Sequence, residues 1–312
     1  MIEAFRAGHL DLGGGCHAWL QPDGGWGLSN AGLIAGRRES LLVDTLFDTR
    51  LTAGMLAGLA PATGGAPIRH VVNTHGNGDH WFGNQSLPDT EIIASAATLA
   101  DMRDVGPEQV RALLAQPGRS GAVARRIFGA FHLEEVVPAY PTTTFDRQLD
   151  LCVGGIDVRL INVGPAHTSG DTIVHVPSAG VVYTGDLVFA GGTPVVWQGP
   201  IANWLRACER IIGLGARTIV PGHGPVATVA AVRAQAAYLR FVQHEAALRH
   251  DRGMTFIEAA HDINLGEYAV LPERERLTVN VHAVYRELDP ATAALDGPAA
   301  FECLGELLED LL

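Results

Sequence analysis

Four short apolar segments of this sequence each run into a turn of small residues and then into a histidine or aspartate. The first segment, residues 68–72, leads into Asn73-Thr74-His75-Gly76-Asn77-Gly78-Asp79-His80-Trp81. The other three lead in the same way to His167, Asp186 and His223. Apolar runs of this length, bounded by glycine and proline, predict buried strands. Glycine allows the sharp turns that aim neighbouring side chains at one point. We therefore expect a sheet whose strand ends deliver these side chains to one place.

The side chains at these strand ends are of the types that bind metal ions. Imidazole nitrogen and carboxylate oxygen suit zinc, iron or manganese. The candidate ligands are His75, Asp79, His80, His167, Asp186 and His223. The sequence thus predicts a metal centre assembled from distant parts of the chain.

This order of residues resembles the metallo-β-lactamase superfamily, which is marked by a His-x-His-x-Asp-His loop followed by a His, an Asp and a His. The pattern stands here as His75-Gly-Asn77-Gly-Asp79-His80, then His167 in Gly-Pro-Ala-His-Thr-Ser-Gly-Asp, Asp186 in Tyr-Thr-Gly-Asp and His223 in Val-Pro-Gly-His-Gly-Pro. The one departure is Asn77, which stands where the family has its second His. The resemblance implies an α/β fold, a four-layer αββα sandwich.

The resemblance also implies two neighbouring metal sites bridged by Asp186. The ligands implied for the first site are His75 and His167, and those implied for the second are Asp79, His80 and His223. Asn77 would be a weak ligand of the first site, because a neutral amide oxygen binds zinc poorly beside imidazole. Zinc, with one or two ions per chain, is the expected cofactor, and manganese or iron are the alternatives. The chain could fill the second site alone, both sites, or the first site alone.

A metal-bound hydroxide would attack a polarised carbonyl, and the metal would stabilise the resulting oxyanion. Asp79 could orient the water and pass a proton to the leaving group. We therefore expect a hydrolase of a small ester, thioester, lactone or amide. Two other functions stay open. One is a mononuclear iron oxygenase or redox enzyme using His75, His167 and Asp186, and the other is a binding protein that has lost a metal through Asn77.

The composition limits the kinds of molecule that we expect the protein to bind. A formal charge of −12 disfavours nucleic acid, because phosphate contacts need clustered basic residues. The four cysteines are scattered, which fits a reducing cytoplasm. The amino terminus lacks an export signal, and no run of eighteen apolar residues predicts a membrane span. We expect a cytoplasmic protein that binds a small molecule, with homodimerisation possible.

The chain divides into a catalytic domain at residues 1–226, with a helical insertion at about 95–132, and a helical extension at residues 227–312 packed on it. Apolar residues three and four apart predict the helices. The extension is interpreted as an added layer or dimer surface. The alternative, suggested by similar additions in the superfamily, is a role over the active-site mouth.

Aromatic residues near the predicted ligands are candidates for a substrate pocket, because indole and phenyl rings form apolar walls. These are Trp81, Phe82, Trp197 and Trp204. Packing beneath the metal loop is the competing interpretation for Trp81 and Phe82. No arginine or lysine adjoins these residues, which favours an apolar or aromatic acyl substrate.

Overall fold

The computed structural model of the protein describes residues 5–310, and its first sheet has seven strands in sequence order. The strands are β1 (Gly8–Gly13), β2 (Cys16–Leu20), β3 (Ala31–Ala35), β4 (Ser40–Val43), β5 (Ile68–Val72), β6 (Glu91–Ser95) and β7 (Thr143–Phe145). Strands β1 to β4 pair antiparallel, and β4 to β7 pair parallel. Strand β1 was not predicted, and its sequence Gly-His-Leu-Asp-Leu-Gly begins and ends with glycine.

The second sheet has five strands in the order β12-β11-β10-β9-β8. They are β8 (Gln148–Val153), β9 (Ile156–Asn162), β10 (Thr172–Val176), β11 (Val181–Tyr183) and β12 (Thr218–Val220). The β11–β12 pair is parallel and the others are antiparallel. Gly154 and Gly155 both have positive φ in the β8–β9 turn, the conformation that a tight hairpin requires.

The two sheets pack face to face around an apolar core. This core includes Ile34 and Val72 from the first sheet and Val174 and Tyr183 from the second. A Cβ atom on Gly32 would lie 2.2 Å from the Tyr183 ring, so the close approach of β3 requires glycine there.

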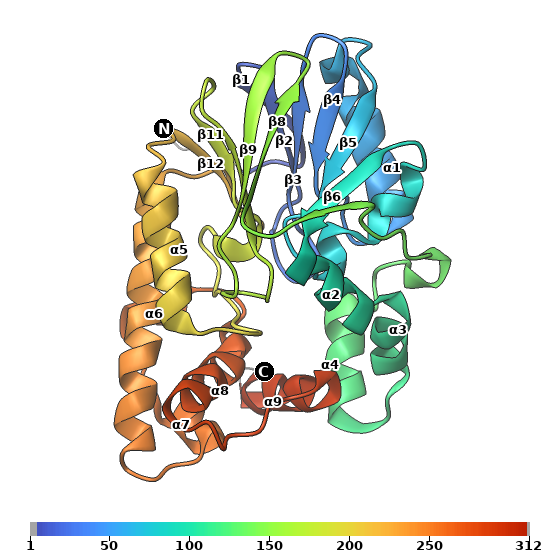
Figure 1. Cartoon of the computed structure of the whole chain (residues 1–312). Helices are drawn as coiled ribbons and strands as arrows, with labels where there is room; N and C mark the ends of the chain where they lie inside the picture. The colour runs from blue at the N-terminus through green and yellow to red at the C-terminus, as the bar shows by residue number, and fades with distance from the viewer. Residues whose placement is uncertain (1–4, 311–312) are drawn as a thin grey trace.

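Helices cover the outer faces of both sheets. Helix α1 (Thr49–Leu59) covers the first sheet, and its N-cap Asp48 accepts a hydrogen bond of 2.8 Å from the Leu51 backbone N–H. Helices α5 (Ile201–Gly213) and α6 (Val229–His250) cover the second sheet, with Trp204 and Leu239 in the same core as β10 to β12. The four-layer αββα sandwich predicted from the sequence is confirmed (Figure 1).

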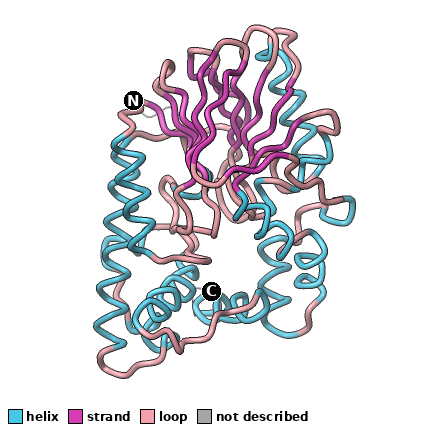
Figure 2. Tube along the Cα trace, viewed as in Figure 1, coloured by secondary structure: helices cyan, strands magenta, loops and turns pink. Residues whose placement is uncertain are grey.

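The predicted insertion consists of α2 (Ala96–Asp104), α3 (Pro107–Ala115) and α4 (Gly118–Phe128). The carboxyl-terminal region adds α7 (Phe256–Asp262), α8 (Leu277–Leu288) and α9 (Gly297–Asp310). Figure 2 shows the strands gathered in the upper half of the molecule and the helices along the sides and below. Helix α9 packs on both α8 and α4, so the end of the chain returns to the insertion (Figure 1).

Across the described residues, every helix is too short or too polar to cross a membrane. The domain boundary after residue 226, a cytoplasmic location and homodimerisation stay predictions.

Candidate metal centre

The six predicted ligands lie at one end of the sandwich, each beyond the carboxyl end of a strand. His75, Asp79 and His80 follow β5, the last two on a short 3-10 turn (Gly78–His80), and all three are buried. His167 lies in the loop between β9 and β10, Asp186 follows β11, and His223 follows β12; all are buried.

The structure brings these side chains into two groups. In each group the ligand atoms lie within 4.8 Å of one another. The first group is His75, His167 and Asp186, and the second is Asp79, His80 and His223. The predicted metal ligands are therefore neighbours in space, divided as the sequence resemblance implied.

Asp186 lies between the two groups. Its Oδ2 atom is 3.4 Å from Nε2 of His167 and 3.3 Å from Nε2 of His223, and its Oδ1 atom is 3.1 Å from Nε2 of His80. Asp79 Oδ2 lies 3.3 Å from the same His223 nitrogen. A bridging position of this kind suits a carboxylate shared by two cations.

Several ligand atoms are buried without a hydrogen-bond partner. Among the side chains described, Nε2 of His75, Nε2 of His80 and Oδ1 of Asp186 are in this state. Burying an unpaired polar atom costs about 1–3 kcal/mol, so each such atom in a native fold needs an explanation. A cation between these atoms supplies one, and the residues present fit a metal ion.

The electrostatics of the cluster divide the histidines into two kinds. Burial lowers the pKa of His75 and takes the pKa of His167 down to about 4, so both rings are neutral at neutral pH and keep a lone pair. Burial also opposes charge on His223, but Asp186 and Asp79 outweigh it and raise the pKa of that ring to about 9. The pKa of His80 is raised in the same way, against burial, by Asp186, Asp79 and Asp44.

Asn77 contacts the first group directly. Its side-chain amide lies 2.7 Å from His167 Nε2, while His167 Nδ1 lies 2.7 Å from the carbonyl oxygen of Val195. Since a carbonyl can only accept, Nδ1 carries the proton and Nε2 of the neutral ring presents a lone pair. In the structure the Asn77 atom nearest this lone pair is its amide oxygen, Oδ1. The amide must turn about its terminal bond for its N–H to donate to Nε2, because the two ends of an amide are assigned from such networks. Asn77 therefore competes with a metal for His167.

Asp44 contacts the ligand cluster from behind His80, and the sequence analysis did not single it out. His80 Nδ1 donates to Asp44 Oδ2 over 2.8 Å, and Asp44 also accepts from the backbone N–H and the hydroxyl of Thr74. A carboxylate behind a ligating histidine fixes its tautomer and orientation. The sequence signal that could have found it is the position of Asp44, directly after the apolar run 41–43. In the structure Asp44 has a positive φ of 64°, which is uncommon for a residue other than glycine.

Two further residues keep the loops in place. Asp171 accepts hydrogen bonds from the N–H and hydroxyl of Thr168 and from the N–H of Ala166, and so holds the loop that carries His167. Gly222 faces Asp186 so closely that a Cβ there would lie 1.9 Å from Oδ1. Asp171 thus holds the loop of His167, and the absence of a side chain at Gly222 leaves room for Asp186.

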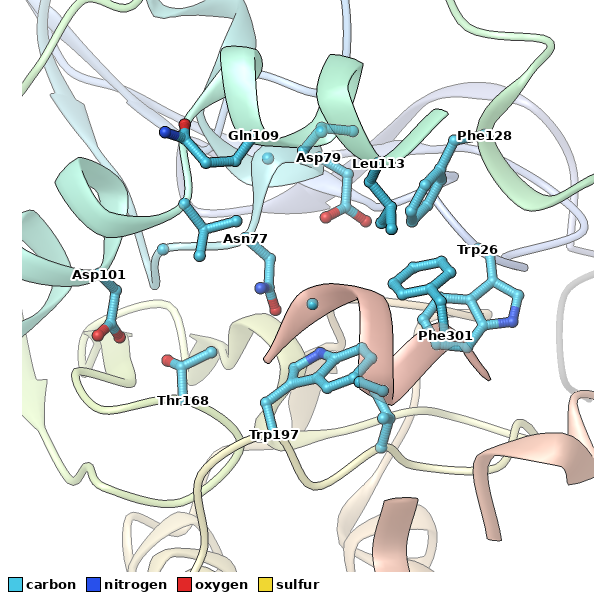
Figure 3. Close-up of a pocket in the computed structure, with 18 of the residues that line it drawn as sticks. Trp26, Asn77, Asp79, Asp101, Gln109, Leu113, Phe128, Thr168, Trp197 and Phe301 are labelled. Carbon is cyan, nitrogen blue, oxygen red and sulfur yellow. The ribbon is translucent and has the colours of Figure 1, made fainter. Parts of the chain in front are cut away.

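A cavity of about 620 Å³ opens onto the cluster (Figure 3). Asn77, Asp79, His167, Asp186 and His223 all border it, so it reaches both ligand groups. This size lies within the range of about 300–1,000 Å³ typical of small-molecule sites.

The aromatic residues around the cavity differ from those predicted. Trp197 lines it, as expected. Trp81, Phe82 and Trp204 do not border it and are almost fully buried, so their assignment to a pocket wall is wrong. The Trp81 indole donates to the carbonyl of Gly76, and the Trp204 indole donates to the carbonyl of Leu187, so these rings pack beneath the ligand loops and hold them.

Six large side chains that the sequence analysis missed also line the cavity. They are the aromatic residues Trp26, Phe47, Phe128, Phe189 and Phe301, together with Arg276. Arg276 and Phe301 come from the carboxyl-terminal region, which thus contributes to the cavity.

Two packed sheets, outer helices and paired His/Asp groups at the strand ends define a metal-binding αββα sandwich protein. Residues 24–223 match the metallo-β-lactamase superfamily, and the chain belongs to that superfamily.

Curated relatives cover the chain unevenly. The chain is 27% identical over 159 residues to the 2,4-dinitroanisole O-demethylase subunit alpha of Nocardioides sp. (strain JS1661), a match of 50% of this chain and only 40% of that protein. It is 25% identical over 230 residues to the hydroxyacylglutathione hydrolase of Erythrobacter litoralis (strain HTCC2594), covering 74% of each.

Solved structures support the fold. The stereoselective inverting sec-alkylsulfatase from Pseudomonas sp. superposes with a TM-score of 0.68 at 16% identity, over 90% of this chain and 50% of that one. The metallo-β-lactamase from Pontibacter korlensis gives a TM-score of 0.58 at 16% identity, over 75% of this chain and 99% of that one.

Proposed function

We propose that the chain is a metal-dependent hydrolase that cleaves a small ester, thioester, lactone or amide at the cluster of His75, Asp79, His80, His167, Asp186 and His223. The observation that carries this proposal is the convergence of these six side chains, three of them with unpaired buried atoms, at the floor of a cavity. The hydrolase named among the relatives supports the same reaction class.

Zinc is the cofactor we propose, held first by Asp79, His80, His223 and Asp186. This second site has two imidazoles and two carboxylates, and Asp44 orients His80 behind it. The first site has only His75, His167 and the shared Asp186, and Asn77 occupies the free nitrogen of His167. We therefore propose unequal affinities, with the second site filling before the first.

A divalent metal bound here would lower the pKa of water from about 15.7 towards about 7 and so supply a nucleophile at neutral pH. Asp79 borders the cavity and places Oδ2 beside His223, so its other oxygen is available to orient that water. After attack, Asp79 can hold the proton and return it to the leaving group.

Hydrolysis of chromogenic esters, thioesters and lactones tests the proposal. Activity should disappear on chelation, return with zinc, and fall sharply in Asp79→Ala. Asp89→Ala is the matched control, because Asp89 is exposed and lies outside both the cavity lining and the two ligand groups. Full activity after both chelation and Asp79→Ala would refute a metal-dependent hydrolase.

The iron oxygenase predicted as an alternative would use His75, His167 and Asp186, which do form a buried group. We favour the hydrolase because this group depends on His167, whose Nε2 contacts Asn77. Iron in the protein as purified, together with oxygen uptake, would reverse that preference. The metal-depleted binding protein is disfavoured because the second ligand group is complete.

A further inference from the structure

The cavity above the cluster is walled by a connected set of aromatic rings. Trp26 lies 6.0 Å from Trp197 and 6.3 Å from Phe128, measured between ring centroids, and Phe128 lies 5.7 Å from Phe301. These residues come from a loop before β3, the loop after β11, helix α4 and helix α9. In Figure 3, Trp26, Phe128 and Phe301 gather on one side, while Asp79 and Asn77 project into the space.

Half-buried rings around a cavity offer contact area to a flat apolar ligand. Trp26, Phe128 and Trp197 are each half-buried, so part of each ring remains open. Aromatic pairs prefer offset or edge-to-face contacts, which contribute beyond simple burial. Leu113 and Leu295 complete the apolar surface. The wall is thus built for a ring system larger than a short acyl chain.

The charged residues of the cavity outside the ligand cluster are mainly acidic. Asp101, Asp104 and Asp296 border it. The sequence contains no lysine, so arginine is the one side-chain type with a permanent positive charge that could bind an anion away from the ligand cluster. Among the described residues that line the cavity, Arg276 is the one arginine.

The charge of Arg276 is already matched within the protein. Its Nη1 atom lies 3.1 Å from Oε2 of Glu273 and donates to the carbonyl oxygen of Thr193 over 2.6 Å. The guanidinium stacks 4.0 Å from the centroid of Trp26, whose indole N–H donates to Glu275 over 2.8 Å. The side chain is only 1% exposed, and its Nε atom, which lacks a partner within residues 5–310, is itself buried.

The Arg276 group therefore fixes Trp26 in the wall and leaves little charge for a ligand. Two carboxylates, Glu273 and Glu275, accompany one guanidinium. Burying an unpaired anionic group beside them would be costly.

Resting on the proposed hydrolase function, we propose that the substrate is an uncharged aromatic acyl compound, whose ring system lies against Trp26, Phe128, Trp197 and Phe301 and whose carbonyl faces Asp79 and His223. Anionic thioesters and sulfate esters are disfavoured by the same wall. The carboxyl-terminal helix α9 acts in substrate selection through Phe301.

Binding of two matched fluorescent probes tests this without turnover. N-phenylnaphthylamine is uncharged, and anilinonaphthalene sulfonate is the same ring system with one sulfonate added. Titrated into the protein as purified, the neutral probe should bind at least about tenfold more tightly, because the aromatic wall offers the sulfonate no unpaired cation. A sulfonate probe that binds equally well or better would overturn the proposal.

Variants locate the binding. Phe301→Ala should weaken the neutral probe by about fivefold or more, whereas Leu308→Ala, on the same helix but outside the cavity, should not. Equal effects of the two variants would place the probe elsewhere and refute the proposal. Asp104→Lys, at an exposed position of the wall, should improve binding of the sulfonate by roughly threefold at low salt and leave the neutral probe unchanged.

Hydrolysis completes the test. The nitrophenyl ester of naphthoic acid should give a kcat/KM at least about tenfold above that of the same ester with a free carboxylate on the distal ring. Comparable rates would show that the hydrolase proposal holds and the substrate proposal fails. Probe binding as expected with no hydrolysis of either ester would show the reverse.

Discussion

Replacing Asn77 with histidine should convert a chain with one tight metal site into one with two. In the native protein a metal at the first site must displace the Asn77 amide from His167 Nε2, a contact of 2.7 Å. A neutral hydrogen bond contributes about 1 kcal/mol net, which is about fivefold in metal affinity. Asn77→Ala should recover that factor. Asn77→His also adds an imidazole, and its gain should exceed the roughly 10–100-fold attributed to outer partners of a ligand.

The assay is zinc binding to chelator-stripped protein, measured by competition with a chromogenic chelator and by elemental analysis after dialysis. At limiting zinc the native chain should retain about one ion per chain, and Asn77→His should retain about two. Gln198→His is the matched control, because Gln198 also borders the cavity but lies outside both ligand groups. Equal stoichiometry and affinity in the native chain and Asn77→His would refute the role given to Asn77.

Three further predictions concern the second site and its support. Asp44→Asn should weaken zinc binding about 10–100-fold, because Asp44 orients His80. The control variant Asp48→Asn alters a helix cap and should lower only thermal stability. Equal zinc affinities of the two variants in chelator competition would contradict this role of Asp44. Gly222→Ala should abolish zinc binding and cost about 1–3 kcal/mol in denaturant unfolding, because the new Cβ falls on Asp186 Oδ1; an intact site would show that the loop adjusts freely. Zinc affinity should rise with pH up to about 9, the raised pKa of His223, because protons compete with metal below it. In the metal-free protein the same ion pairs stabilise the fold fully below pH 6.5, and that stabilisation is lost as pH rises through about 9; flat pH profiles in calorimetry and thermal melts would contradict both expectations.

The strand ends and their ligands could be predicted because each depends on local sequence. An apolar run predicts a buried strand, and a glycine or proline turn marks its end. The polar residue that follows the turn must then lie at that end of the sheet. Residues 68–72 and His75 illustrate this, since β5 has the predicted bounds. Asp44 was missed because its partner His80 lies 36 residues away and only the folded loops bring them together.

The residues of the cavity wall could not be predicted from local sequence in this way. A large aromatic residue near a ligand loop suits burial as well as exposure to a pocket, and burial prevails for Trp81 and Trp204. Trp26 and Phe301 lie almost at opposite ends of the chain and reach one wall only because α9 packs against α4. Helical periodicity predicts that such a helix exists but not where it packs.

The most direct test of the central claim is a zinc titration of the stripped protein in which bound metal and hydrolysis of the neutral naphthoate ester are measured in the same samples. We expect activity to rise in proportion to the first equivalent of zinc, with no such rise in Asp79→Ala. Activity that is complete before any metal binds, or zinc that binds without producing hydrolysis of any ester, thioester, lactone or amide, would contradict the claim that these six side chains form a hydrolytic metal centre.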